Sequence, residues 1–236
     1  FVKMNELRDS GVDPLIIDAG DLFFSTANLN SKNKKSELYR AGAILEGYNR
    51  VGCDAINVGH YEVLNGLSFL KSMEEKTEIP FLSANLRDAQ TNKLLFEPFR
   101  IIEKELLKIG IVGVTDKLPD TTKSMIADNY IEAGNHYIDE VSKQADIIVI
   151  MVNSDRKTYS ELPTLFANAD FIVTSGSTNM TRENTKQTDG GPFLYSCGKQ
   201  GKYMSVLNVN MEDKNAPIVD ISSHEKNISS IRKRFE

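Results

Sequence analysis

Residues 54–62 read Asp-Ala-Ile-Asn-Val-Gly-His-Tyr-Glu. The apolar residues of 54–58 predict a short buried strand, and Gly59 marks the turn after it. His60 and Glu62 follow the carboxyl end of that strand, which is where ligand-binding residues gather in α/β folds. This stretch therefore predicts a strand of an α/β sheet with a polar site at its end.

The same alternation of strand and helix continues on both sides of this stretch. Apolar runs of strand length occur at 15–17, 81–83, 147–152 and 171–173. Helical spacing occurs at 1–7, 38–48 with Ser36 as the N-cap, 67–73, 131–144, 159–167 and 228–235. Further strands are expected as a hairpin at 96–103 and 106–114, and at 193–197, 203–211 and 218–221. This order predicts a layered α/β architecture with mixed sheets.

Composition excludes several classes of function. The chain has 236 residues, of which 40% are hydrophobic and 26% are charged, so it can bury a core without a disulfide or a metal. A net charge of -5 argues against nucleic acid as a partner, and the longest aliphatic run, 147–152, is too short to span a membrane. Because residue 1 is Phe and not Met, we expect a processed or trimmed chain, whose location cannot be deduced from this end.

Two cysteines do not make a disulfide framework. Cys53 and Cys197 are interpreted as small buried residues, with a single disulfide or one reactive thiol as the alternatives. A redox role would require an accessible thiol of low pKa, whereas the place of Cys53 at the start of a strand favours burial.

Polar residues gather at four of the expected strand ends. They are the segments 18–21, 59–62, 152–155 and 174–179. Together they predict a polar cleft with carboxylates at Asp21 and Asp155. Because His60 is its one imidazole, these residues alone do not predict a complete metal site.

The order and spacing of several motifs resemble the calcineurin-like metallophosphatase domain of the 5′-nucleotidase and UDP-sugar hydrolase family. The motifs are Ile17-Asp18-Ala19-Gly20-Asp21, 52–59 with Gly66, 82–86, 108–115, 145–149 and 198–203. The resemblance implies a four-layered α/β/β/α sandwich over 1–222, a linker helix at 223–236 and a periplasmic or extracytoplasmic location. The family also has a first strand with an Asp-x-His motif ahead of the first helix, and the sequence from Phe1 onward does not contain this motif.

The family's activity depends on two divalent metals, such as Mn, Zn or Fe, held by Asp, His and Asn on strand-end loops. By resemblance, Asp21 matches the bridging carboxylate, while His60 replaces a ligand Asn and Asn153 replaces a ligand His. Tyr61 occupies the position of the family's catalytic His. The ordinary pKa of a tyrosine, about 10, makes it a poor acid at neutral pH. Gly176 and Thr178 replace the two His of a Gly-His-x-His motif.

Two functions follow from this comparison. The first is a degenerate domain without hydrolysis or cofactor, which acts as a binding or scaffold module for an unknown protein or small molecule. The alternative is an active phosphoester hydrolase with a metal site rebuilt from Asp21, His60 and Asn153. The other cleft residues are Asp18, Glu62, Asn85, Asp155, Gly176 and Thr178.

Single residues also have purely structural interpretations. Asp21 can cap a turn, since Asp after Gly commonly does so, and His60 can be a hydrogen-bonded residue at a strand end. His136 and His224 are expected on the surface.

Overall fold

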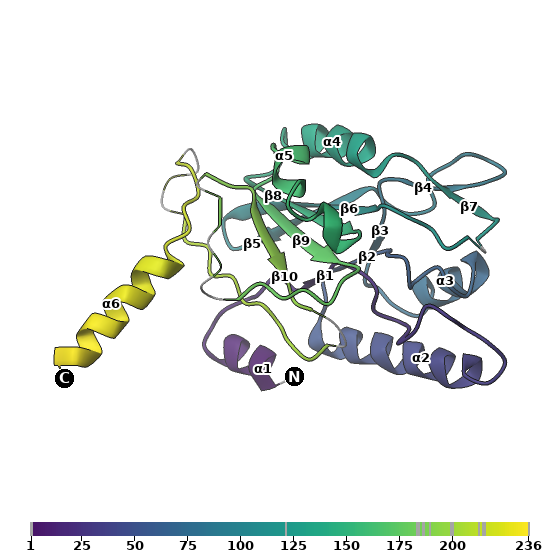
Figure 1. Cartoon of the computed structure of the whole chain (residues 1–236), viewed down its shortest axis with the longest axis horizontal. Helices are drawn as coiled ribbons and strands as arrows, with labels where there is room; N and C mark the ends of the chain where they lie inside the picture. Colours follow the sequence, from purple (N-terminus) through teal and green to yellow (C-terminus); the bar gives the residue numbers. More distant parts are fainter. Residues whose placement is uncertain are drawn as a thin grey trace.

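The computed structural model describes residues 2–120, 122–182, 185, 187–188, 190–198, 201–211, 213 and 216–235. Its body has two sheets packed face to face, with helices on both outer surfaces (Figure 1). The mixed α/β class and the layered arrangement expected from the sequence are confirmed. The domain limits at 222 and 223 stay a prediction.

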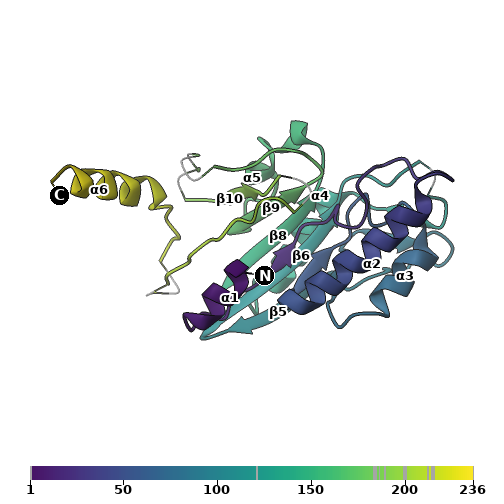
Figure 2. The same cartoon turned by 90° about the horizontal axis from the view of Figure 1, so that it is seen from below.

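The first sheet is parallel and has the order β1 (Ile17–Asp18), β2 (Ala55–Asn57) and β3 (Phe81–Leu82). Its outer face is covered by α2 (Lys34–Val51) and α3 (Leu67–Glu74), which lie side by side in Figure 2. α2 ends at Gly52, whose φ of 70° is the left-handed conformation of a helix C-cap. Ala41, Leu45 and Leu70 bury the facing sides of these helices in one core cluster.

The second sheet has the order β10-β9-β8-β6-β5. β6 (Leu107–Thr115), β8 (Ile147–Asn153), β9 (Phe171–Ser175) and β10 (Phe193–Ser196) are parallel, and β5 (Phe99–Lys104) pairs antiparallel with β6 as the expected hairpin. All residues of β8 are buried, as its continuous apolar run predicts for a central parallel strand. The outer face carries α4 (Tyr130–Val141) and α5 (Leu162–Leu165) (Figure 1).

The two sheets meet through small and medium apolar side chains. Ala55 and Leu82 of the first sheet pack with Ile111 and Met151 of the second. The layers are therefore α/β/β/α, and the carboxyl ends of the parallel strands of both sheets open toward one edge. A separate antiparallel pair, β4 (Leu86–Asp88) and β7 (Met125–Ala127), was not expected from the sequence, because three residues carry too little pattern to be recognised.

Several sequence expectations were wrong. No strand forms over the described residues of 203–211 and 218–221. The apolar residues of 203–209 are 39–61% exposed, because strand-like alternation gives a strand only where a neighbouring edge supplies hydrogen bonds. The expected helix at 159–167 is reduced to α5, preceded by a 3-10 turn at Arg156–Thr158. α2 has Asn33, not Ser36, at its N-cap.

The remaining helices lie at the two ends of the described chain. α1 (Val2–Asp9) buries none of its side chains, and α6 (Ser222–Phe235) follows the extended segment. In the described part of the chain, no helix combines the length and apolar character that a membrane crossing needs. His136 and His224 are exposed, as expected.

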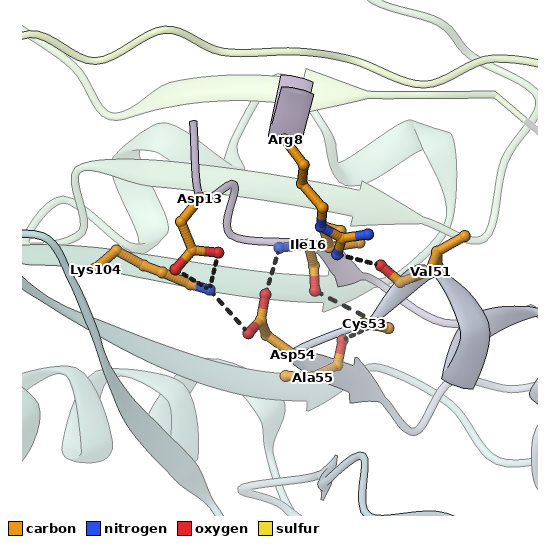
Figure 3. A network of polar contacts seen from close by, with 8 residues as sticks. All are labelled: Arg8, Asp13, Ile16, Val51, Cys53, Asp54, Ala55 and Lys104. Atoms are coloured by element: carbon orange, nitrogen blue, oxygen red, sulfur yellow. Dashed lines mark hydrogen bonds and ion pairs between the residues drawn. The ribbon is translucent and has the colours of Figure 1, made fainter. Parts of the chain in front are cut away.

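A polar network ties the N-terminal segment to the first sheet (Figure 3). The Lys104 ammonium is 17% exposed and pairs with Asp13 at 3.1 Å and with Asp54 at 3.4 Å. Asp54 also accepts a hydrogen bond from the Ile16 amide at 2.7 Å, and Arg8 donates to the carbonyl of Val51 at 2.5 Å. These contacts fix the position of the segment that leads into β1. They lie at the amino end of the first sheet, opposite the polar edge.

Cys53 lies inside this network. It is 6% exposed, and its thiol lies 3.4 Å from the carbonyl oxygens of Ile16 and Ala55. Burial raises the pKa of this thiol far above its usual range, with the Asp18 carboxylate adding to the effect. Both Cys53 and Cys197 are free cysteines, so they form no disulfide with each other.

We expect a thiol reagent at neutral pH to label one cysteine of the folded protein quickly. Cys197 is partly exposed, whereas the Cys53 thiol is buried and stays protonated. Denaturant should release the second reactive group, and Cys197→Ser should abolish the fast phase. Fast labelling that survives in Cys197→Ser would contradict the structural role of Cys53.

Candidate functional site

A cavity of about 570 Å³ opens at the carboxyl edge of the two sheets. The residues that line it lie at or after the carboxyl ends of β1, β2, β6, β8 and β9. They are Asp21, Ala27, His60, Tyr61, Leu64, Asp116, Lys117, Leu118, Pro119, Asp120, Asn153, Ser154, Asp155 and Gly176. The convergence expected for polar strand ends in an α/β fold therefore occurs here.

Glu62 ties the first two loops of this edge together. Its carboxylate is fully buried, with Oε2 accepting from the amides of Asp21 at 2.8 Å and Gly59 at 2.9 Å. Oε1 accepts from the amides of Leu22 at 2.6 Å and Phe23 at 3.2 Å. Burial raises the pKa of Glu62 to about 8, and the Asp21 carboxylate adds to that rise, while the amide donors oppose it. Glu62 therefore acts as a buried clamp, which means that it holds the segment after β1 against the turn after β2 next to the cavity.

Asp21 sits in a turn that its own side chain helps to hold. Its φ is 64°, in the left-handed region that Asp tolerates better than most residues. Oδ1 accepts a hydrogen bond from the Tyr61 amide at 2.9 Å. Burial raises the pKa of the Asp21 carboxyl, whereas hydrogen bonds from Tyr61 and Asn153 lower it. Asp21 therefore combines a role in the turn with a position on the cavity wall.

The Asn153 amide links three strand ends. Its Oδ1 accepts from the His60 amide at 2.9 Å, and its Nδ2 donates to the Ser175 hydroxyl at 2.7 Å. The Ser175 hydroxyl in turn donates to the carbonyl of Ala19 at 2.6 Å. Asn153 is 3% exposed, so both ends of its amide are used inside the protein.

His60 and Tyr61 line the cavity next to each other, with ring centroids 5.9 Å apart. The His60 Nδ1 lies 3.3 Å from the carbonyl oxygen of Lys117. Burial raises the pKa of the Tyr61 phenol, and the Asp21 carboxylate raises it further. Tyr61 therefore keeps its proton at neutral pH and can donate a hydrogen bond to a ligand.

Other residues singled out in the sequence are structural or peripheral. The Asp18 carboxylate accepts from the Tyr48 hydroxyl at 2.5 Å and from the Gly20 amide at 2.8 Å, and burial raises its pKa. Asn85 is fully buried and pairs with both the amide and the carbonyl of Thr115. Neither Asp18 nor Asn85 borders the cavity.

The two positions of the expected Gly-His-x-His motif differ in their placement. Gly176 borders the cavity and has a φ of 92°, and a Cβ on it would meet the Ser154 carbonyl at 2.5 Å. Thr178 is exposed and does not line the cavity. Asp155 lies at the rim, where it pairs with Lys117 at 3.1 Å.

Curated proteins and solved structures resemble this chain, although no family model matches it. A 5′-nucleotidase of Vibrio cholerae is 36% identical over 102 residues, which are 43% of this chain and 18% of that protein. Protein UshA of Salmonella pullorum is 36% identical over 104 residues, 44% of this chain and 18% of that protein. A putative 5′-nucleotidase from Staphylococcus aureus superposes with a TM-score of 0.65 at 20% identity, over 84% of this chain and 43% of the other.

These findings support a metallophosphatase domain of the 5′-nucleotidase family in this chain. The chain spans about a fifth of the length of the first two relatives. The relatives and the α/β/β/α layers both support the resemblance drawn from the motifs.

The donors among the described residues do not form the ligand set of a two-metal centre. Such a centre needs several ligands for each of two ions held about 3.5–4 Å apart. Over the described residues, no three His, Cys, Asp or Glu side chains are grouped so that they could hold a metal. The Asn153 side-chain oxygen accepts a hydrogen bond from the His60 backbone amide. Gly176 has no side chain that could bind a metal.

One wall of the domain's cavity was not expected from the sequence. Residues 116–120 follow the carboxyl end of β6 and supply Asp116, Lys117, Leu118, Pro119 and Asp120. The signal was available, because 106–114 was expected to be a strand and polar residues follow it directly.

Proposed function

We propose that this metallophosphatase domain is degenerate and uses its cavity to bind a ligand without hydrolysing phosphoesters by the two-metal route. The observation that carries the proposal is that both ends of the Asn153 side-chain amide are hydrogen-bonded within the protein. At the position of a family ligand, its oxygen accepts from the His60 amide and its nitrogen donates to Ser175. These two bonds fix the orientation of the amide, so the Asn153 oxygen has one remaining lone pair for a metal and the nitrogen has none.

Two neighbouring positions support the same function. Tyr61, at the position of the catalytic His, has a raised pKa and is therefore a poor proton donor to a leaving group near neutral pH. Gly176 cannot accept the His that the family has there without moving the Ser154 backbone. The cavity of about 570 Å³ has charged and polar residues in its wall, which suit a small polar ligand.

An active hydrolase with a rebuilt site is the second candidate. The observation in its favour is that Asp21, His60 and Asn153 all border one cavity. His60 and Asp21 are side chains of the kind that bind Mn, Zn or Fe. This function requires the Asn153 oxygen to coordinate a metal. It must either give up its hydrogen bond from the His60 amide or use its second lone pair.

Metal content and turnover, measured together, separate the two candidates. After dialysis of the chain's longest natural form against excess manganese, zinc or iron, we expect far less than one metal per chain by mass spectrometry. Hydrolysis of nucleoside monophosphates and UDP-sugars should equal that of Asp21→Asn, because no pair of metals clamps the phosphate. A 5′-nucleotidase that retains all of its ligands serves as the positive control.

Near-stoichiometric metal, with turnover that disappears in Asp21→Asn and His60→Ala, would overturn the binding role in favour of the hydrolase. That the ligand is a small molecule or a protein stays a prediction. The extracytoplasmic location also stays a prediction, drawn from the family resemblance.

A further inference from the structure

α6 presents an apolar stripe that the rest of the described chain does not cover. Ile228 and Ile231 are each 51% exposed, and Ile221, just before the helix, is 54% exposed. All side chains of α6 that the structure describes are exposed. Figures 1 and 2 both show α6 standing away from the layered body.

The stripe has the spacing of a helix-pairing seam. Ile221, His224, Ile228 and Ile231 follow one another at intervals of three, four and three residues. That pattern is the alternation of the two inward-facing positions of a heptad repeat. A lone helix of 14 residues is marginal in water, so α6 gains stability from a partner that covers this seam.

Charges beside the seam decide which partner fits. Glu225 and Arg232 are both exposed and stand seven residues apart, at the same heptad position on one flank of the seam. In an antiparallel pair of identical helices, this flank faces itself in reverse order. Glu225 of each copy then lies opposite Arg232 of the other, and the two-fold axis makes the contact twice.

We propose that α6 pairs antiparallel with α6 of a second copy of this chain. A parallel pair is disfavoured, because it would bring Asp220 of one copy toward Glu225 of the other. The contact is short, with three isoleucines and one histidine from each copy. The resulting dimer is therefore reversible and depends on protein concentration.

Sedimentation equilibrium over a range of concentrations tests this pairing. The average mass is expected to rise from the monomer value of 26.4 kDa toward twice that value. Ile228→Asp should lower the association constant by about tenfold or more, because it puts a charge into the seam. Tyr39→Asp, at an 80% exposed position on α2, should leave the association constant unchanged.

A charge exchange gives the sharper test, since loss of the helix alone cannot reproduce its pattern. Glu225→Arg and Arg232→Glu should each weaken association, because like charges then face each other across the seam. The double variant should restore association to near the wild-type value. A wild-type protein that stays monomeric, or that dimerises without regard to these substitutions, would overturn the pairing and leave α6 to another partner.

Discussion

Glu62→Gln is expected to destabilise the protein by about 2–5 kcal/mol. Four buried backbone amides donate to the two oxygens of the Glu62 carboxyl group, two to each, and both oxygens keep lone pairs in the protonated form that prevails at pH 6. A glutamine keeps one acceptor oxygen and places an NH₂ group against the other two amides, which then lack a partner. Urea unfolding at pH 6 measures the loss, and Glu46→Gln, on an exposed ion pair with Arg50, should have almost no effect.

The size of this loss should depend on pH with a defined sign. The pKa of Glu62 is raised from its ordinary value of 4.5 to about 8 in the folded state. The stability that the residue contributes is therefore complete below pH 4.5 and decreases as the pH rises through about 8. The difference between wild type and Glu62→Gln should shrink over that interval. A difference that grows with pH would show that the amide donors, not burial, determine the pKa of Glu62.

Gly59→Ala is expected to cost about 1–3 kcal/mol and to disturb the cavity wall. A Cβ at this position would lie 2.9 Å from the Asn153 Nδ2, the Asp21 amide nitrogen and the Glu62 Oε2. These three groups belong to the bonds that hold the strand-end loops, so none of them can move without breaking a contact. Thermal unfolding measures the cost, and amide NMR shifts at His60 and Asn153 report the local change.

The matched control is Gly42→Ala. Gly42 lies within α2, and a Cβ there would meet nothing within 4 Å. The same chemical change should therefore stabilise the protein by about 0.5–1 kcal/mol, because alanine restricts the unfolded chain and favours helix. Equal changes in stability at the two positions would mean that crowding around Gly59 does not exclude a larger side chain there.

Much of the fold could be predicted from local patterns. The buried run of β8, the hairpin of β5 and β6, and α4 are long enough for periodicity to identify them. The same pattern failed at 203–211, where alternating apolar residues have no neighbouring strand among the described residues. Hydrogen bonding to a neighbour is a property of the sheet and not of the segment, so the sequence could not reveal it.

The sequence by itself determined which polar residues stand at the strand ends, and therefore that Asp21, His60, Tyr61 and Asn153 share one edge. Only the tertiary structure decided what these residues do there. Glu62, which looks like any acidic residue in the sequence, becomes a buried clamp, and Asn153 becomes a tie between loops. The reason is physical: once strand ends converge, buried backbone amides need acceptors, and the nearest carboxylates and amides supply them.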